Sequence, residues 1–296
     1  MQTILSHISQ EIGEGIASYR SIPGGDISSA YQLQTETKKY FLKVNTNPFA
    51  LAMFHAEQKG LQTIEKTKTI AIPHVYVVGS LEGKSFLLMD FVEAKRPDAN
   101  DFRQFGTQLA QLHRCTQKDF GFLSDNFIGS LPQSNRLHPD WAEFYWHERI
   151  SPQLKLAYDH QLLHKKEIPS LENALPVFRE IFGVVKPSLL HGDLWAGNYL
   201  ISTDGTPYLI DPAAYYGHSL VDIAMSKLFG SFGQSFYDAY HEINPKSENY
   251  SQQIELYQLY YLLVHLNLFG SGYYSSVPSV LRKYFTKIII TVLTIS

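Results

Sequence analysis

This 296-residue sequence has little cysteine and little net charge, and each shortage disfavours a class of protein. Cys115 is the single cysteine, so no internal disulfide can form, which is typical of a reducing compartment. A formal net charge of −3 argues against a nucleic-acid-binding protein, which would usually be basic. The apolar run 288–295 is too short to span a bilayer, so no membrane association is expected. The N-terminus has no basic segment followed by an apolar core, so we expect a cytoplasmic protein.

The residue pattern divides the chain into a β-rich first part and a mainly helical remainder. A length of 296 residues allows two domains or two lobes of one fold. Short strand-forming runs fill the first part, and the pattern turns helical from Asp98 onward. Helices are expected at 1–19, 48–64 and 256–270, and strands at 31–35, 40–44, 72–78 and 85–89.

One stretch, Pro187 to Asp211, carries the strongest chemical signal. Two short strands joined by the hairpin signal Asp204-Gly205 follow the sequence His-Gly-Asp. The stretch therefore sets Asp193, Asn198 and Asp211 around one β-ribbon. Phosphoryl transfer uses such a set: a carboxylate that orients the attacking hydroxyl and accepts its proton, and oxygen ligands for Mg²⁺ on the nucleotide phosphates. Strands are expected here at 188–190, 199–201 and 207–210.

The pattern H-G-D-x-x-x-x-N, followed by an aspartate at the end of the next strand, resembles the catalytic and metal-binding loops of kinases. Protein kinases usually have H-R-D-x-x-x-x-N and D-F-G at these places. Gly192 in place of arginine, and Asp211-Pro212 in place of D-F-G, resemble instead the aminoglycoside phosphotransferase branch, which mostly acts on small molecules. The alternative is a surface hairpin whose polar residues fall at these positions by chance.

A lysine within an apolar strand is a second signal. Lys43 lies in the run Phe41–Val44, and a charge in such a run is costly to bury unless it is paired. Glu57, in the helical stretch 48–64, is the natural partner. A strand lysine that pairs with a helix glutamate and reaches the α- and β-phosphates is the kinase arrangement. The alternative is that Lys43 points outward from an edge strand.

Two further segments are expected at the nucleotide. Gly24 and Gly25 precede the first pair of strands, where small residues would let backbone N–H groups approach a triphosphate. They fit a plain turn as well, and no G-K-[ST] follows them, so this is not a Walker A motif. Met89 to Phe91 are placed by analogy at the connection between two lobes, where backbone groups would meet adenine.

Three polar residues of the helical part need an interpretation. We expect Asp222 to accept hydrogen bonds from the backbone of the turn 191–193 rather than to act as a third metal ligand. His113 ends an apolar stripe and is interpreted as a structural histidine. His265 interrupts an apolar helix, which fits a core histidine and a pocket-lining residue equally well.

Nine short stretches carry a more specific resemblance; they are Gly24-Gly25 with Tyr31, Phe41–Asn45, Met53–Glu57, Phe120–Gly129, Asp140–Phe144, His191–Asn198, Asp211–Ala213, Leu228–Gly230 and Leu266–Gly270. In this order they closely resemble the fructosamine kinase (ketosamine 3-kinase) family, from about residue 20 to residue 285. Trp195 in the catalytic loop and Asn-Phe-Ile-Gly at 126–129 separate this family from aminoglycoside and choline kinases.

The resemblance implies an α+β, two-lobed, protein-kinase-like fold of the aminoglycoside phosphotransferase type. A small β-rich lobe (1–92) would bind the nucleotide, and a larger, mainly helical lobe (93–296) would carry catalysis and bind the substrate. The implied activity is ATP- and Mg²⁺-dependent phosphorylation of the 3-hydroxyl of ketosamines, free or protein-bound, in deglycation repair. Asp26 stands where many relatives have a cysteine, so thiol-based regulation through that loop is not expected.

The same resemblance implies a role for each matching residue. Asp193 would orient the substrate hydroxyl and accept its proton. Asn198 and Asp211 would hold Mg²⁺ on the phosphates. Lys43, positioned by Glu57, would neutralise charge on the nucleotide.

Trp195, Trp141 and His265 are the candidates for the sugar pocket, because aromatic faces suit the C–H surface of a sugar. Trp141 suits the protein core equally well. Rival functions are a kinase of the same fold that acts on an aminoglycoside or an amino alcohol, a nucleotide-binding protein without catalysis, and a protein kinase. A protein kinase is disfavoured because no A-P-E-like segment is present. The preferred sugar, the choice between free and protein-bound substrate, and the oligomeric state are left open.

Overall fold

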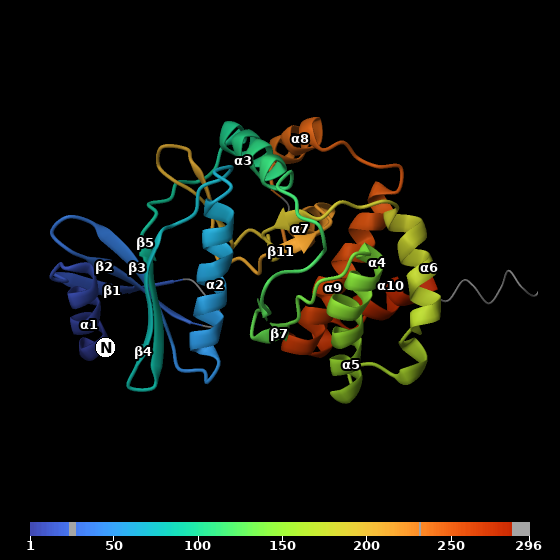
Figure 1. The fold of residues 1–296 in the computed structure, drawn as a ribbon, viewed down its shortest axis with the longest axis horizontal. Helices are drawn as coiled ribbons and strands as arrows, with labels where there is room; N and C mark the ends of the chain where they lie inside the picture. Colours follow the sequence, from blue (N-terminus) through green and yellow to red (C-terminus); the bar gives the residue numbers. More distant parts are fainter. Residues whose placement is uncertain (24–27, 231, 286–296) are drawn as a thin grey trace, which may run out of the picture.

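The computed structural model describes residues 1–23, 28–230 and 232–285. Figure 1 shows a sheet flanked by two helices on the left and a larger, mainly helical lobe on the right. The N-terminal lobe contains α1 (Gln2–Ile12), β1 (Ser18–Ile22), β2 (Ser29–Gln34), β3 (Lys39–Asn45), α2 (Ala50–Glu65), β4 (Val75–Leu81) and β5 (Lys84–Asp90). The expected α+β division of the chain is confirmed.

The described part of the C-terminal lobe combines helices and turns with three short two-stranded sheets, β6-β7, β8-β11 and β9-β10. Its first half contains α3 (Ala99–Leu112), β6 (Asn126–Ile128), β7 (Leu131–Gln133), α4 (Trp141–Phe144), the π-helix η1 (Tyr145–Ile150), α5 (Ser151–Asp159), the 3₁₀ turn η2 (Lys165–Glu167) and α6 (Leu171–Phe182). Its second half contains β8 (Ser188–Leu190), β9 (Tyr199–Ile201), β10 (Pro207–Leu209), β11 (Tyr215–Gly217), α7 (Leu220–Leu228), α8 (Gln234–Ile243), α9 (Tyr250–Phe269), the 3₁₀ turn η3 (Ser271–Tyr273) and α10 (Ser276–Phe285).

The N-terminal lobe is built on a five-stranded antiparallel sheet in the order β1-β2-β3-β5-β4. Strand β3 lies in the middle, with Lys43 opposite Ala30 of β2 on one side and Leu87 of β5 on the other. The alternative that Lys43 lies on an edge strand is therefore wrong. Both neighbours hold the backbone of the strand in place, which fixes the direction of the lysine side chain.

Helices α1 and α2 cover opposite faces of this sheet (Figure 1). Ile8 of α1 packs in one cluster with Phe86, whereas Phe54 of α2 packs in another cluster with Leu87. Successive side chains of a strand point to opposite faces, so neighbours on β5 belong to different cores. Helix α2 lies on the face that is turned toward the C-terminal lobe.

The first helix is shorter than the expected 1–19. It ends at Ile12, and Gly13 follows in the left-handed conformation with φ 71°, which terminates a helix. Ser18–Ile22 then form the edge strand β1, paired with β2. Four of its five residues are exposed, so no alternation of apolar and polar residues marks it as a strand in the sequence.

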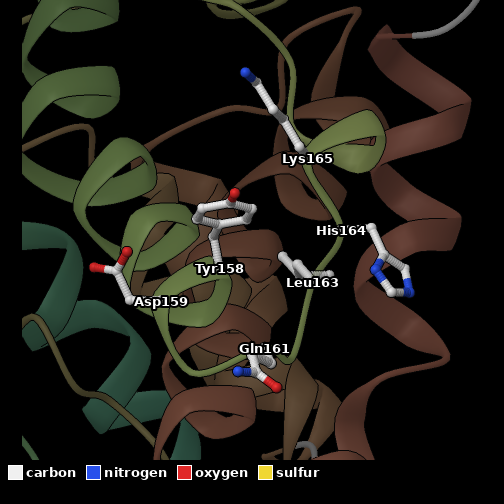
Figure 2. A pocket seen from close by; sticks show the side chains of 6 residues that line it. All are labelled: Tyr158, Asp159, Gln161, Leu163, His164 and Lys165. Carbon is white, nitrogen blue, oxygen red and sulfur yellow. The ribbon is translucent and has the colours of Figure 1, made fainter.

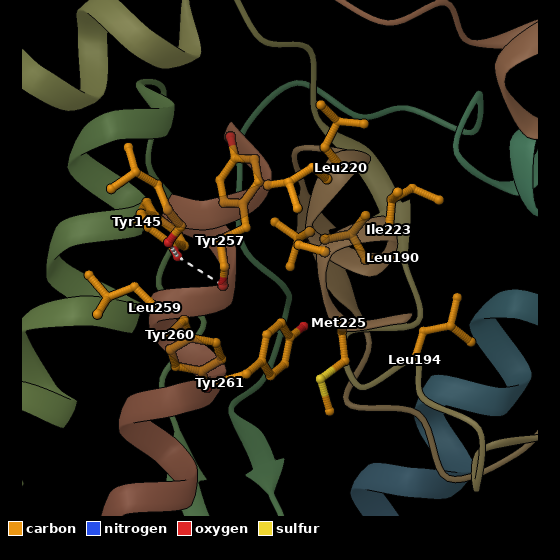
Figure 3. Packing of buried hydrophobic residues seen from close by; sticks show 14 of the residues in the cluster. Tyr145, Leu190, Leu194, Leu220, Ile223, Met225, Tyr257, Leu259, Tyr260 and Tyr261 are labelled. Atoms are coloured by element: carbon orange, nitrogen blue, oxygen red, sulfur yellow. Dashed lines mark hydrogen bonds between the residues drawn. The ribbon is translucent and has the colours of Figure 1, made fainter. Parts of the chain in front are cut away.

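The core of the C-terminal lobe surrounds the long helix α9. Tyr257, Tyr260 and Tyr261 of this helix are at most 1% exposed. Figure 3 shows their rings among Leu190, Ile223 and other buried residues of the surrounding elements. The Tyr145 hydroxyl of η1 donates a hydrogen bond to the carbonyl of Leu256, at 2.8 Å, so a buried ring is also oriented by a polar contact.

The β9–β10 hairpin joins the two lobes. Leu209 donates a backbone hydrogen bond to Ala71, which precedes β4, and Lys95 donates one to Ile201. The hairpin follows the expected catalytic loop, so these contacts set the position of that loop against the sheet. Within the described ranges, no helix has the length and apolar character needed to cross a membrane. The apolar segment 288–295 lies outside those ranges.

Candidate active site

A cleft with a volume of about 1160 Å³ lies between the two lobes. Its walls come from β2, β3, α2 and the end of β5 on one side, and from β6, the loop before β9, α7 and α9 on the other. Nine of the residues expected from the sequence line it: Lys43, Glu57, Met89, Phe91, Asp193, Trp195, Asn198, Asp211 and His265. Residues separated by more than 200 positions in the sequence therefore face one cavity.

The catalytic turn is held by a buried aspartate. Asp222 is fully buried on α7 and accepts hydrogen bonds from the backbone N–H groups of His191, at 2.7 Å, and Gly192, at 2.8 Å. His113 lies 3.0 Å from the same carboxylate, and its other ring nitrogen lies 2.8 Å from the Tyr240 hydroxyl. The expected role of Asp222 and the structural role of His113 are thus confirmed.

Position 192 requires glycine for a steric reason. Its φ is +84°, and a Cβ placed there would lie 2.2 Å from the carbonyl oxygen of Ala213. The turn can therefore lie directly against the loop 211–214 only if residue 192 has no side chain, whereas protein kinases have an arginine here. Tyr261 donates a hydrogen bond to the Gly192 carbonyl, at 2.8 Å, which ties the turn to α9.

Trp195 projects from the loop that follows this turn. A Cβ at position 197 would lie 2.4 Å from its ring, so Gly197 leaves the space in which the indole lies. The ring is partly exposed and lines the cleft. The Trp-Ala-Gly-Asn sequence thus combines an exposed aromatic face with the residue that makes room for it.

Asp193 and Asn198 form the hydrogen-bonded centre of the site. The Asn198 amide donates to the carboxylate of Asp193, at 3.1 Å, and to its backbone carbonyl, at 2.9 Å. Burial and the nearby carboxylate of Asp211 raise the pKa of Asp193 to about 7. A carboxylate whose pKa is raised toward neutrality is a better proton acceptor than an exposed aspartate.

Lys43 links the two lobes by contacts with two carboxylates. Its ammonium lies 2.8 Å from Glu57 of α2 and also donates to Asp211. Burial disfavours the lysine cation, but the two carboxylates outweigh this effect and raise the pKa of Lys43. Burial likewise opposes ionisation of Asp211, yet Lys43 beside it lowers the pKa of Asp211, whereas burial raises that of Glu57 to about 8. The ion pair with Asp211 is a contact that the sequence pattern did not predict.

The donor set fits Mg²⁺ held partly by phosphates. Asn198 directs its amide nitrogen to Asp193, which leaves Oδ1 as a possible ligand, and Asp211 adds a carboxylate on the other side of the hairpin. Among the described residues, no group of three or more His, Cys, Asp or Glu side chains could hold a metal. Mg²⁺ is commonly bound by one or two protein oxygens together with substrate phosphates and water, which matches this pair.

Two expectations for the sugar pocket have different outcomes. Trp141 is 4% exposed in the core, where its indole N–H donates to the Tyr257 hydroxyl at 2.9 Å, so its placement in the pocket is wrong. Because the indole N–H of Trp141 is already hydrogen-bonded and its ring packs on Phe144, no face of this side chain is open to a ligand. His265 does line the cleft and hydrogen-bonds the Tyr261 carbonyl through Nδ1, at 2.8 Å. Gly24, Gly25 and Asp26 lie outside the described residues.

The sequence pattern missed most of the apolar lining. The cleft is also lined by Ala30, Phe41, Leu200 and Ile210. A second apolar group in the lining, Phe229, Phe269 and Tyr273, packs around His265. One signal could have found part of the second group. Tyr261, His265 and Phe269 are spaced by four residues on one helix, so they lie on one face.

A second hollow lies on the C-terminal lobe, with a volume of about 660 Å³. Figure 2 shows that its labelled side chains come from one short segment, 158–165, at the end of α5. It contains none of the residues expected to take part in phosphoryl transfer. The interlobe cleft is therefore the place where the residues expected to take part in phosphoryl transfer come together.

A lysine on the central strand, an Asp–Asn pair in the catalytic loop and an aspartate after the next strand together define a kinase-like phosphotransferase that acts on a hydroxyl group. The chain matches the fructosamine kinase family over residues 1–287 and belongs to that family.

Individual relatives agree with this assignment. The chain is 40% identical to a chloroplastic protein-ribulosamine 3-kinase of Arabidopsis thaliana, over 91% of this chain and 83% of the relative. A crystal structure from Thermobifida fusca assigned as a fructosamine-3-kinase superposes with a TM-score of 0.86 at 30% identity, covering 97% and 99% of the two chains. The aminoglycoside phosphotransferase APH(4)-Ia, in a ternary complex with ADP and hygromycin B, shares the fold, with a TM-score of 0.62 at 15% identity over 95% and 98% of the chains.

Proposed function

We propose that this protein transfers the γ-phosphoryl group of ATP to the 3-hydroxyl of a ketosamine, and so takes part in deglycation. Residues 1–92 form the nucleotide-binding lobe, and residues 93–296 form the catalytic and substrate-binding lobe. One observation carries the proposal: the Asp193 carboxylate is fixed by Asn198 in the same cleft as the Lys43–Asp211 pair. Membership of the fructosamine kinase family supports the ketosamine as substrate.

Asp193 orients the 3-hydroxyl and accepts its proton as the oxygen attacks phosphorus. The reaction needs an acceptor within hydrogen-bond reach of that hydroxyl, and the raised pKa of Asp193 suits the role. Asp222 acts indirectly, because it holds the backbone on either side of the turn from which Asp193 projects. The positioned carboxylate is thus the base, and its support comes from a separate helix.

The phosphates are held by groups from both lobes. Lys43, directed by Glu57, neutralises negative charge on the nucleotide, and Asn198 and Asp211 supply the oxygen atoms that would hold Mg²⁺. When bound, Mg²⁺ would neutralise negative charge that develops on the phosphates during the transfer. Met89 and Phe91 line the apolar half of the cleft, which suits adenine.

The sugar lies against Trp195 and His265. The partly exposed indole offers a face for the C–H surface of a sugar, and the imidazole offers a polar atom. The acceptor is a ketosamine, either free or attached to a protein, and the reaction takes place in the cytoplasm. An aminoglycoside or amino alcohol as acceptor is not favoured, because the relatives over most of the chain are ketoamine and ribulosamine kinases.

The test measures ADP release with Mg-ATP and fructosamine, ribulosamine and erythrulosamine adducts, with kanamycin and choline for comparison. We expect turnover of ketosamines and a loss of about 10²–10⁴-fold in kcat for Asp193→Asn. Asp238→Asn, at an exposed position outside the lining of the cleft, serves as the matched control. Turnover of kanamycin or choline alone would contradict the proposed substrate, and near-full activity of Asp193→Asn would contradict the proposed base.

A further inference from the structure

Four aromatic side chains gather on the wall of the cleft that the C-terminal lobe forms, at the end of α7, on α9 and on η3. We name Phe229, His265, Phe269 and Tyr273 the aromatic rim; all four line the cleft. The ring of His265 lies 4.2 Å from that of Phe229, 5.2 Å from that of Tyr273 and 5.4 Å from that of Phe269, measured between centroids. Phe269 is 60% exposed. Large apolar rings that face a cleft and remain open to water are typical of a ligand-binding surface.

The rim stands at a defined distance from the catalytic turn. Tyr261 donates a hydrogen bond to Gly192, the neighbour of Asp193, and the same helix carries His265 and Phe269. With a rise of 1.5 Å per residue, these two residues lie about 6 Å and 12 Å farther along α9. A group attached to the reacting sugar therefore reaches the rim when it extends away from the 3-hydroxyl by roughly these distances.

The chemistry of a ketosamine places its amine substituent in that position. The amine nitrogen is bonded to C1, two carbons from the carbon that bears the 3-hydroxyl, and the substituent extends beyond the nitrogen. With the hydroxyl at Asp193 and the sugar against Trp195, the substituent points past the sugar. The proposed function thus requires an additional surface next to the sugar pocket, and the aromatic rim lies along the helix that supports the catalytic turn.

The charges of this half of the cleft restrict what the substituent can be. Four carboxylates of the described chain line the cleft: Glu57, Asp90, Asp193 and Asp211. None of them belongs to the lining segments 225–229 and 261–273, which carry the aromatic rim. A polycationic substituent would find no further counter-ion. An apolar substituent on a single ammonium gains both contact area and attraction between the cation and the ring faces.

On the basis of the proposed function, we infer that the aromatic rim is the binding site for the amine-derived part of the substrate and selects ketosamines of amines with an apolar carbon skeleton. Aralkyl amines and the four-carbon side chain of a lysine within a peptide belong to this class. Glycine, with a carboxylate next to the nitrogen, and polyamines do not. Phe229 and Phe269 are specificity-determining residues, because their side chains offer apolar contact area to the substituent and have no polar atom.

The test compares one ketose on three amines: benzylamine, lysine blocked at its α-amine and carboxylate, and glycine. We expect KM to be lowest for the benzylamine and blocked-lysine adducts. Phe269→Ala should raise KM for the benzylamine adduct about tenfold, with kcat within about twofold of wild type and with a much smaller effect on the glycine adduct. Phe229→Leu, which nearly conserves volume, should act in the same direction.

Phe49→Ala is the matched control. Phe49 is 61% exposed and begins α2 outside the lining of the cleft, so this variant should behave as wild type on all three adducts. Equal KM values for the three adducts in the wild type, or an equal rise for all three in Phe269→Ala, would overturn the inference while leaving the proposed function intact. No turnover of any adduct would overturn both.

Discussion

The two ends of the cleft are built from different interactions. At the catalytic end, each ionisable group is held by polar partners: Asp193 by Asn198, and Lys43 by Glu57 and Asp211. At the aromatic rim, rings pack on one another, and His265 hydrogen-bonds the backbone carbonyl of Tyr261. Directional contacts fix atoms to within a fraction of an ångström, whereas apolar contact tolerates shifts. The catalytic end is therefore suited to positioning reacting groups. The aromatic rim is suited to binding part of the substrate through apolar contact area.

The difference has a structural origin. The catalytic end is assembled at the boundary between lobes, where the central strand β3, helix α2 and the β9–β10 hairpin meet. The aromatic rim lies within one lobe, at the end of α7, on α9 and on the turn after α9. A substitution at the first end should therefore act on the rate, and one at the second should act on substrate affinity.

The sharpest test of the catalytic end replaces Asp211. Asp211→Asn removes a charged partner of Lys43 and a ligand proposed for Mg²⁺, so we expect kcat to fall about 10²–10³-fold. ADP release at several Mg²⁺ concentrations measures the effect. Asp204→Asn changes an exposed aspartate in the turn of the same hairpin and should stay close to wild type. Equal kcat values for the two variants would contradict the role assigned to Asp211 at the catalytic end.

The support behind the catalytic turn predicts a combined effect on stability and rate. Asp222→Asn replaces one acceptor oxygen by an N–H₂ group that faces backbone N–H groups, so we expect the free energy of unfolding to fall by about 2–4 kcal/mol. Urea unfolding followed by fluorescence measures it, with exposed Asp238→Asn as the control. An unchanged unfolding midpoint together with normal kcat would show that the turn holds its position without this carboxylate.

Two of the three tryptophans, Trp141 and Trp195, distinguish the core from the cleft. Trp141→Phe loses a buried hydrogen bond to Tyr257, and we expect a destabilisation of about 1–3 kcal/mol with little change in KM. Trp195→Phe should instead raise KM for the ketosamine several-fold and leave the unfolding free energy nearly unchanged. Thermal unfolding and steady-state kinetics on both variants decide between these outcomes. Reversed effects would exchange the roles assigned to the two rings.

The last prediction concerns the pH dependence of stability. Nδ1 of His218 lies 2.6 Å from the Tyr257 hydroxyl, and burial lowers the pKa of His218 to about 3. Near pH 7 the imidazole is neutral both folded and unfolded. Below the ordinary histidine pKa of about 6.5 the unfolded chain binds a proton that the folded chain does not, so stability falls as the pH falls toward 3.

His218→Asn should flatten that slope, because asparagine offers an acceptor without a proton-binding site. Unfolding free energies between pH 4 and pH 7 would be compared with those of exposed His55→Asn, which should keep the wild-type slope. A slope unchanged in His218→Asn would assign the acid sensitivity to other groups.

Local patterns predicted much of the fold and site. The strands around Asp193, the pairing of Lys43 with Glu57 and the support from Asp222 follow from short motifs whose geometry is largely set within a few residues or by a strong need to pair a buried charge. The edge strand β1 was missed because its side chains are mostly exposed. Its hydrogen bonds with β2, rather than its residue pattern, make it a strand.

The sequence by itself determined the family, and it predicted the residues of the catalytic end, since aspartate, asparagine and lysine at these spacings have few other reasons to occur together. Only the tertiary structure decided that Trp141 belongs to the core, that Lys43 contacts Asp211 as well as Glu57, and that four rings form the aromatic rim. Burial and contact across long sequence separations depend on how whole helices pack, and no local pattern contains that information.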